Sequence, residues 1–137
     1  MIKTKSNNVN IKDIHPLLSQ FLEDMSSMFT GIVVTSGNDS VHMVGSRHYI
    51  GKALDFGANS SEKKAYAAFK SYVLSNKKSL KEKYQLEDII DEGTHIHVEM
   101  PLTIDESKTI KTKQYTLIGI GVLVLSGILL YYFKIKK

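Results

Sequence analysis

The feature that most constrains how this 137-residue chain can fold is a ten-residue stretch that matches a pattern of five fixed residue types. Its pattern is Ser-x-His-x-x-Gly-x-Ala-x-Asp, which falls on Ser46, His48, Gly51, Ala53 and Asp55. A neutral imidazole and a carboxylate are two of the commonest zinc ligand types, and a glycine between them permits a tight turn. If residues 53–56 form a strand, Asp55 points away from the face that Leu54 and Phe56 share. The stretch therefore predicts a strand that is polar toward a site and apolar toward a core.

A second segment, residues 94–100, shows the same alternation. It reads Thr-His-Ile-His-Val-Glu-Met, so His95 and His97 fall on one face of a strand and the apolar residues beside them on the other. Two such strands can bring His48, Asp55 and His97 together. Three protein ligands and an open fourth position are typical of a catalytic zinc site. The two segments therefore predict a zinc centre.

Together these motifs resemble the zinc D-Ala-D-Ala carboxypeptidases and related peptidoglycan endopeptidases. That superfamily also includes the lysostaphin-type enzymes and the hedgehog signalling domain. The resemblance covers roughly residues 11–101, and its first motif is highly specific. It implies an α+β fold with a small antiparallel sheet and flanking helices, one Zn²⁺ ion, and cleavage of cell-wall peptide bonds. By position, His48, Asp55 and His97 match the zinc ligands of the family.

The downstream motif fits two branches of this family. In one branch a Glu-x-x-His pair supplies a base and a ligand, and Glu92 and His95 have that spacing. In the other branch the second histidine of His-x-His binds the metal and the first assists catalysis. Strand alternation favours His97 as the ligand, which leaves His95 and Glu92 as the candidates for proton transfer.

The substrate contacts are less well defined. Many family members carry a substrate-binding arginine shortly after Thr-Ser-Gly, but this chain has Asp39 there. Arg47, Lys52 or His42 could supply a donor instead, and the sequence does not choose among them. Ser46 is better placed to orient a ligand than to act as a nucleophile, because no base is evident for it. The missing arginine favours an endopeptidase over a carboxypeptidase.

The positive charge of the chain is concentrated in its tail. Residues 108–137 contain six lysines and no acidic residue, whereas residues 1–107 carry 12 basic and 14 acidic side chains. The net charge of +4 and the pI of about 9.2 therefore reflect the tail, and we expect no nucleic-acid partner. The absence of cysteine excludes disulfides and cysteine-ligated metals.

Polar and apolar segments divide the chain into five parts. Residues 1–13 are polar, lack the apolar run of a secretory signal peptide, and are expected to be flexible. Residues 14–102 form the zinc peptidase-like domain. Residues 103–114 are expected to be a polar linker, residues 115–133 an apolar span, and residues 134–137 a basic tail.

Within the domain we expect short elements. Pro16 suits the first turn of a helix whose apolar residues recur at helical spacing as far as Met28. A buried strand over residues 32–35 should follow. A capping box at residues 59–62 predicts a second helix, and residues 86–90 predict another strand.

The apolar span has the length of a membrane helix. Residues 115–133 carry no charge, and 19 helical residues extend about 28 Å, close to the hydrocarbon thickness of a bilayer. Tyrosines stand at both ends, where aromatic belts lie, and we expect a single C-terminal anchor in contact with lipid. Three lysines lie on each side, so the positive-inside rule selects no orientation. The membrane would be that of a virus particle or the bacterial cytoplasmic membrane.

These features predict a membrane-anchored zinc peptidase that hydrolyses amide bonds in peptidoglycan stem or cross-link peptides, with a lytic enzyme of a phage or virion as one setting. The alternative is a catalytically inactive zinc-binding interaction protein or structural membrane protein on the same fold, as the hedgehog domain illustrates. The presence of Glu92 and His95 favours the enzyme.

Overall fold

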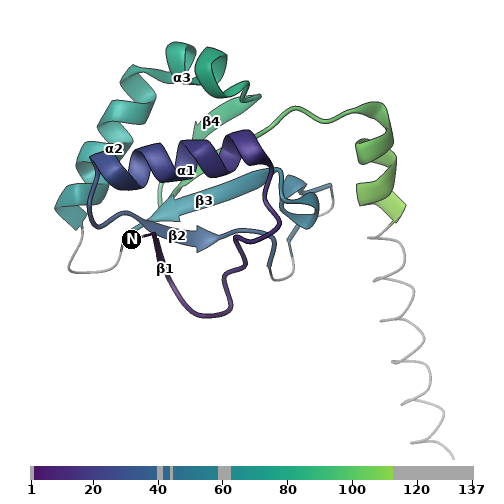
Figure 1. The fold of residues 1–137 in the computed structure, drawn as a ribbon, viewed down its shortest axis with the longest axis horizontal. Coiled ribbons are helices and arrows are strands. Elements are labelled where there is room, and N and C mark those ends of the chain that lie inside the picture. Colours follow the sequence, from purple (N-terminus) through teal and green to yellow (C-terminus); the bar gives the residue numbers. More distant parts are fainter. Residues whose placement is uncertain (1, 40–41, 44, 59–62, 113–137) are drawn as a thin grey trace, which may run out of the picture.

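The computed structural model describes residues 2–39, 42–43, 45–58 and 63–112. This part of the chain has an α+β fold in which helices pack on one face of a five-stranded mixed sheet (Figure 1). In chain order the elements are β1 (Lys3–Thr4), α1 (Pro16–Met28), β2 (Val33–Ser36), the 3₁₀ helix η1 (Arg47–Ile50), β3 (Ala53–Gly57), α2 (Lys63–Ser75), α3 (Lys77–Tyr84), β4 (Asp88–Asp91) and β5 (Ile96–Glu99). The predicted α+β class is confirmed, but the sheet is mixed rather than wholly antiparallel.

The sheet has the strand order β1-β2-β3-β5-β4. The pairs β2–β3, β3–β5 and β5–β4 are antiparallel, whereas β1 runs parallel to β2. The sequence gives no indication of β1, and residues 1–13 were expected to be flexible. The Lys5 N–H donates to the Val34 carbonyl at 2.9 Å, and Ile2 and Ile11 pack against the core. Backbone pairing and scattered apolar side chains thus join to the domain a segment that has no periodic pattern.

Amphipathic helices cover one face of the sheet. The buried residues of α1 recur at helical spacing, which confirms the predicted helix and its start at Pro16. The ring of Phe21 contacts Phe56 of β3 and Tyr84 of α3 edge-on, at centroid distances of 5.8 and 5.2 Å. Phe69 of α2 belongs to the same buried cluster. All three helices therefore share one core with the sheet.

The opposite face of the sheet carries polar residues. On β3 and β5 the core residues Leu54 and Val98 are fully buried and lie opposite each other. Their neighbours Asp55 and His97 also lie opposite each other, and the pleat turns them to the other face. Ile90 of β4 pairs with His97 and is exposed. The alternation predicted from the sequence is therefore present in both strands.

The segment expected to be a polar linker is helical over residues 104–112. Thr103 and Glu106 cap it reciprocally, because the Glu106 N–H donates to Thr103 Oγ1 at 3.2 Å and the Thr103 N–H donates to Glu106 Oε2 at 2.8 Å. Lys52 Nζ joins this cap to the domain through Glu106 Oε2 at 2.8 Å and the Pro101 carbonyl at 3.0 Å. The predicted linker thus contains a Thr-x-x-Glu capping box, which its polar composition did not indicate.

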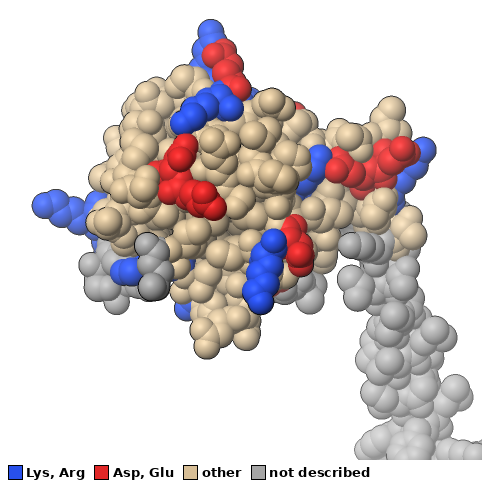
Figure 2. Space-filling view, viewed as in Figure 1, with Lys and Arg blue, Asp and Glu red and all other residues tan. Residues whose placement is uncertain are grey.

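Charged side chains of both signs are interspersed on the surface. Figure 2 shows Lys and Arg side chains beside Asp and Glu side chains on one face of the domain. The ion pairs include Lys70–Asp91 at 2.7 Å and Lys83–Asp24 at 3.0 Å. Such exposed pairs contribute about 0–1 kcal/mol each, so packing of the core rather than surface charge stabilises the fold.

Three predicted features lie outside the described residues: the capping box at residues 59–62, the apolar span at residues 115–133 and the basic tail at residues 134–137. Within the described ranges, no helix combines the length and the apolar character needed to cross a bilayer.

Candidate metal centre

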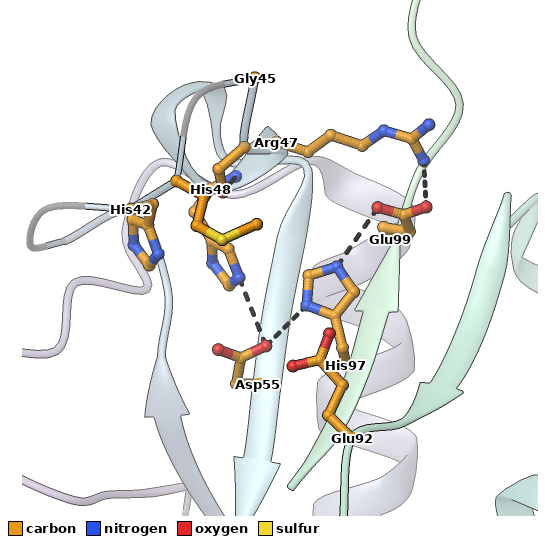
Figure 3. A pocket seen from close by; sticks show the side chains of 10 residues that line it. His42, Gly45, Arg47, His48, Asp55, Glu92, His97 and Glu99 are labelled. Atoms are coloured by element: carbon orange, nitrogen blue, oxygen red, sulfur yellow. Dashed lines mark hydrogen bonds and ion pairs between the residues drawn. The ribbon is translucent and has the colours of Figure 1, made fainter. Parts of the chain in front are cut away.

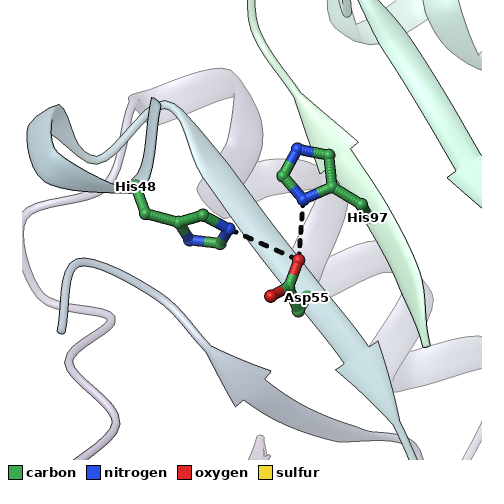
Figure 4. A group of neighbouring side chains, drawn as sticks. All are labelled: His48, Asp55 and His97. Atoms are coloured by element: carbon green, nitrogen blue, oxygen red, sulfur yellow. Dashed lines mark hydrogen bonds and ion pairs between the residues drawn. The ribbon is translucent and has the colours of Figure 1, made fainter. Parts of the chain in front are cut away.

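A carboxylate and an imidazole face each other across two strands at the centre of the site. β3 and β5 are antiparallel, and Asp55 and His97 are partners in their register. Residues directly opposed in this way have Cβ atoms about 4.5–5.5 Å apart, so the two side chains meet on the same face. His97 Nδ1 lies 2.7 Å from Asp55 Oδ1 (Figure 4). The register of the sheet therefore sets this contact.

His48 approaches the same carboxylate from η1. This helix follows Ser46, whose hydroxyl accepts the His48 N–H at 3.3 Å, and it ends at Gly51, where φ is +68°. The turn leads into β3 and leaves His48 Nε2 3.3 Å from Asp55 Oδ1. The His48 side chain is buried, with 3% of the residue exposed. A serine cap and a glycine turn thus explain the two small residues that flank His48 in the motif.

His48, Asp55 and His97 form a candidate metal-binding triad. One ligand atom from each residue lies within 4.8 Å of those of the other two. A tetrahedral zinc ion with ligands at about 2.0–2.1 Å would hold its ligand atoms about 3.3 Å apart, so small side-chain movements suffice to close the site. The three residues predicted as ligands are therefore brought together.

The outer nitrogens of both histidines are held by oxygen atoms. His48 Nδ1 lies 2.9 Å from the Gly37 carbonyl, which can only accept, so this nitrogen carries a proton. His97 Nε2 lies 3.3 Å from a Glu99 carboxylate oxygen, which favours a proton there too. With a cation bound, the inner nitrogens, His48 Nε2 and His97 Nδ1, would each present a lone pair to it. Metal-bound histidines are oriented in this way, so the residues present fit a divalent cation that takes nitrogen and carboxylate ligands.

The Asp55 carboxylate dominates the electrostatics of the triad. Burial raises its pKa, but hydrogen bonds from His48 and His97 outweigh burial and hold the pKa of Asp55 well below its ordinary value. Burial lowers the pKa of His97, but Asp55 and then Glu99 outweigh it and raise the pKa. A bound cation would displace the proton that lies between His97 Nδ1 and Asp55 Oδ1, because an imidazole must be neutral to act as a ligand.

The two residues predicted for proton transfer lie beside the triad and contact each other. Glu92 Oε2 is 2.9 Å from His95 Nε2, and the same nitrogen is 3.7 Å from Asp55 Oδ1. The side chains are 46% and 27% exposed, so both can exchange protons with solvent. The structure brings the two candidates together without separating their roles.

A cleft of about 430 Å³ opens over the triad (Figure 3). One wall comes from the segment that includes His42 and Arg47, and the other includes Glu92 and Glu99. The volume lies in the range of about 300–1,000 Å³ that is typical of small-molecule sites. The triad is therefore accessible to a ligand from this side of the sheet.

His42 is fixed in the wall of this cleft. Its ring stacks on that of His48, with a centroid distance of 4.2 Å and an interplanar angle of 5°. The Tyr49 hydroxyl accepts the His42 N–H at 2.9 Å and donates to the His42 carbonyl at 2.7 Å. Burial, and then the neighbouring His48, lower the pKa of His42. These contacts hold the His42 ring against His48 at the edge of the triad.

Arg47, one of the candidate substrate donors, and Asp39 both have partners within the protein. Arg47 Nη1 lies 2.7 Å from Glu99 Oε1. Asp39, at the position where family members carry arginine, accepts the Gly37 N–H at 2.6 Å and the Asn10 N–H at 3.3 Å. Its carboxylate therefore joins its own turn to the N-terminal segment.

The sequence alone did not indicate Glu99 or Tyr49 as site residues. Glu99 follows His97 by two positions, so the alternation that selects His95 and His97 also extends to it. Tyr49 contacts His42, which lies outside the helices and strands, and no pattern in the sequence indicates this contact.

Comparison with known proteins leaves the site to be interpreted from its own geometry. No protein-family model matches this chain, and a search of curated proteins finds no significant match. The function proposed for this chain therefore rests on the geometry of the site and on the resemblance of its two motifs to peptidoglycan peptidases.

Proposed function

We propose that this chain is a zinc-dependent peptidase that hydrolyses amide bonds in the stem or cross-link peptides of peptidoglycan. The observation that carries the proposal is the triad of His48, Asp55 and His97 with the Glu92–His95 pair beside it. Three protein ligands leave a coordination position open, as a catalytic zinc requires. The resemblance of the motifs to cell-wall peptidases supplies the substrate class.

The chain's own residues divide the chemistry between holding the ion and moving a proton. His48 through Nε2, Asp55 through a carboxylate oxygen and His97 through Nδ1 would hold zinc. When bound, zinc lowers the pKa of water toward neutrality and polarises a carbonyl group. The Glu92 carboxylate lines the cleft and is placed to accept a proton and to return it to the leaving amine. His95 Nε2, 2.9 Å from Glu92 Oε2, orients this carboxylate or shares the proton.

The charges near the cleft support cleavage of an internal amide bond rather than release of a terminal residue. A carboxylate taken out of water needs a cation or several donors. Arg47 is paired with Glu99 at 2.7 Å, and Lys52 with Glu106 at 2.8 Å. In the described part of the chain, both cations considered as substrate donors are therefore already engaged, which favours an endopeptidase.

We also propose that residues 115–133 anchor the domain to a viral membrane or to the bacterial cytoplasmic membrane. These 19 uncharged residues lie outside the described ranges, and the proposal rests on their composition. Protease protection in sealed vesicles would show on which side the domain lies. A full-length chain that stays soluble without detergent would contradict the anchor.

Peptidoglycan digestion tests the proposed activity. Zinc-loaded full-length protein in detergent is incubated with purified peptidoglycan, and released fragments are identified by mass spectrometry. We expect new amino termini within cross-link peptides, loss of activity with a chelator, and recovery on adding zinc. Glu92→Gln should lower the rate by roughly a hundredfold or more while zinc remains bound. Glu82→Gln, at an exposed position of α3, is the matched control and should have no effect.

Two outcomes would change the proposal. Free D-alanine as the main product would indicate a carboxypeptidase. A zinc-loaded protein that releases nothing from any type of peptidoglycan would indicate the inactive zinc-binding alternative.

A further inference from the structure

Glu99 connects the two elements that carry the histidines of the triad. Its Oε1 atom lies 2.7 Å from Arg47 Nη1, and its Oε2 atom lies 3.3 Å from His97 Nε2 (Figure 3). Arg47 and Glu99 are 21% and 20% exposed at their side chains, and His97 is 14% exposed. This row of three side chains is therefore largely shielded from water.

The contact with Glu99 determines how His97 can face the triad. A histidine that binds a cation through Nδ1 must carry its proton on Nε2, and a carboxylate that accepts this proton fixes both the tautomer and the ring orientation. His97 and Glu99 lie two residues apart on β5, so they share one face of the strand. Glu99 therefore holds the His97 ring through Nε2, the ring nitrogen that is not in contact with Asp55.

Arg47 extends this contact to the other ligand-bearing element. It precedes His48 in η1, whereas Glu99 lies on β5, so the ion pair links η1 to β5 across the cleft. The guanidinium also holds one oxygen of a carboxylate that would otherwise be free to rotate away from His97. The pair is thus placed to maintain the distance between His48 and His97.

We propose that Glu99 is a positioning residue for the metal ligand His97, and that Arg47 acts on the metal site through Glu99. This inference rests on the metal-binding part of the proposed function and is independent of peptidase activity. It assigns to Arg47 a role in building the site in place of a role in holding substrate.

Zinc affinities of variants of the full-length protein in detergent test the proposal, measured by competition with a chromophoric chelator. Glu99→Gln should weaken zinc binding by about 10- to 100-fold, and Glu99→Ala by at least as much. Arg47→Met should weaken it less, and the double variant E99Q/R47M should be no weaker than Glu99→Gln alone. Lys83→Met, which removes an ion pair of α3 with Asp24, is the matched control and should match the wild type.

Two further measurements separate positioning from a purely structural role. The visible absorption of Co²⁺ in the site should change in Glu99→Gln, because the orientation and basicity of a ligand change. The unfolding midpoint of the metal-free Glu99→Gln protein should match the wild type, since glutamine keeps the size and one acceptor oxygen.

The results that overturn the proposal are distinct from those that overturn the peptidase. Zinc binding by Glu99→Gln within twofold of the wild type would overturn the role of Glu99, as would an affinity loss that only follows a lower unfolding midpoint. Losses that multiply in the double variant would overturn the claim that Arg47 acts through Glu99. A wild-type protein without zinc affinity would overturn this inference and the proposed function together. The expected pattern of affinities supports the inference even in a protein that cleaves no peptidoglycan.

Discussion

Replacing Gly51 with alanine would perturb the turn that joins the helix of His48 to the strand of Asp55. Gly51 has a φ of +68°, in the left-handed backbone region that residues other than glycine rarely adopt. A Cβ atom at this position would overlap the Asp13 carbonyl oxygen and lie 2.9 Å from the Asp13 carbonyl carbon. The His15 N–H also donates to the Gly51 carbonyl at 2.8 Å, so the chain before α1 is packed tightly against this turn.

Two terms set the size of the effect. The left-handed conformation costs alanine about 1–2 kcal/mol. Relieving the overlap requires the backbone near Asp13 to move, which costs about 1–3 kcal/mol more if it resembles an overpacked core. The total of about 2–5 kcal/mol is a large part of a domain stability of about 5–15 kcal/mol. Gly93→Ala is the matched control, because Gly93 has a φ of +82° and a Cβ there would meet no atom within 4 Å. Gly93→Ala should be destabilised only by the conformational cost of about 1–2 kcal/mol.

Urea unfolding of the full-length protein in detergent, followed by circular dichroism, measures both changes. The two variants differ by the overlap term of about 1–3 kcal/mol, so with a slope of about 1–3 kcal/mol per molar the midpoint of Gly51→Ala should fall about 0.3–3 M below that of Gly93→Ala. Zinc affinity should fall only in Gly51→Ala, because only there must η1 shift. Equal midpoints in the two variants would refute the reasoning, since they share the conformational cost and differ only in the overlap.

Three other predictions follow from the described contacts. His97→Ala should lose stoichiometric zinc by elemental analysis while His95→Ala keeps it, and the reverse result would assign the ligand to the Glu-x-x-His pair. Phe21→Ala should lower the free energy of unfolding by about 3–5 kcal/mol in urea, because its fully buried ring contacts β3 and α3. The Lys52 ammonium, and then a backbone N–H, lower the pKa of Glu106 to about 2. Because this folded-state pKa is below the unfolded value of about 4.3, the contact stabilises the C-terminal helical segment above that pH and is lost as the pH falls toward 2. Protection factors for amide hydrogen exchange in residues 104–112, corrected for the intrinsic pH dependence of exchange, should fall over this range in the wild type and show no such fall in Glu106→Gln.

The period of two in a strand explains why two of the three candidate ligands could be predicted from the sequence. Asp55 alternates with Leu54 and Phe56, and His97 follows the same rule, so each strand shows locally which residues share a face. The motif spacing then selected His48. What local spacing cannot supply is the register between strands, and the structure shows that β3 and β5 pair with Asp55 opposite His97.

Other features depended on contacts between distant residues that no spacing encodes. The strand β1 pairs through its backbone, and backbone groups are the same for every residue type. Arg47 could be recognised as a cation, but its partner Glu99 lies 52 positions away on another element. Only the fold brings the two together, and the proposed role of Arg47 in supporting the site depends on that contact.

The core and the candidate metal site lie on opposite faces of β3 and β5, so the stability of the core and the geometry of the site depend on the same strand pairing. A slip of one residue between β3 and β5 would place Asp55 opposite Ile96 or Val98, so one of the two strands would turn its polar side chains into the core. The register that buries the core is therefore the register that forms the contact between Asp55 and His97. His48 is different, because it reaches the site from η1, outside the sheet. Substitutions of the core-facing residues of β3 or β5 should lower stability and metal affinity together, whereas changes to site-facing side chains or in η1 can lower metal affinity while the core stays intact.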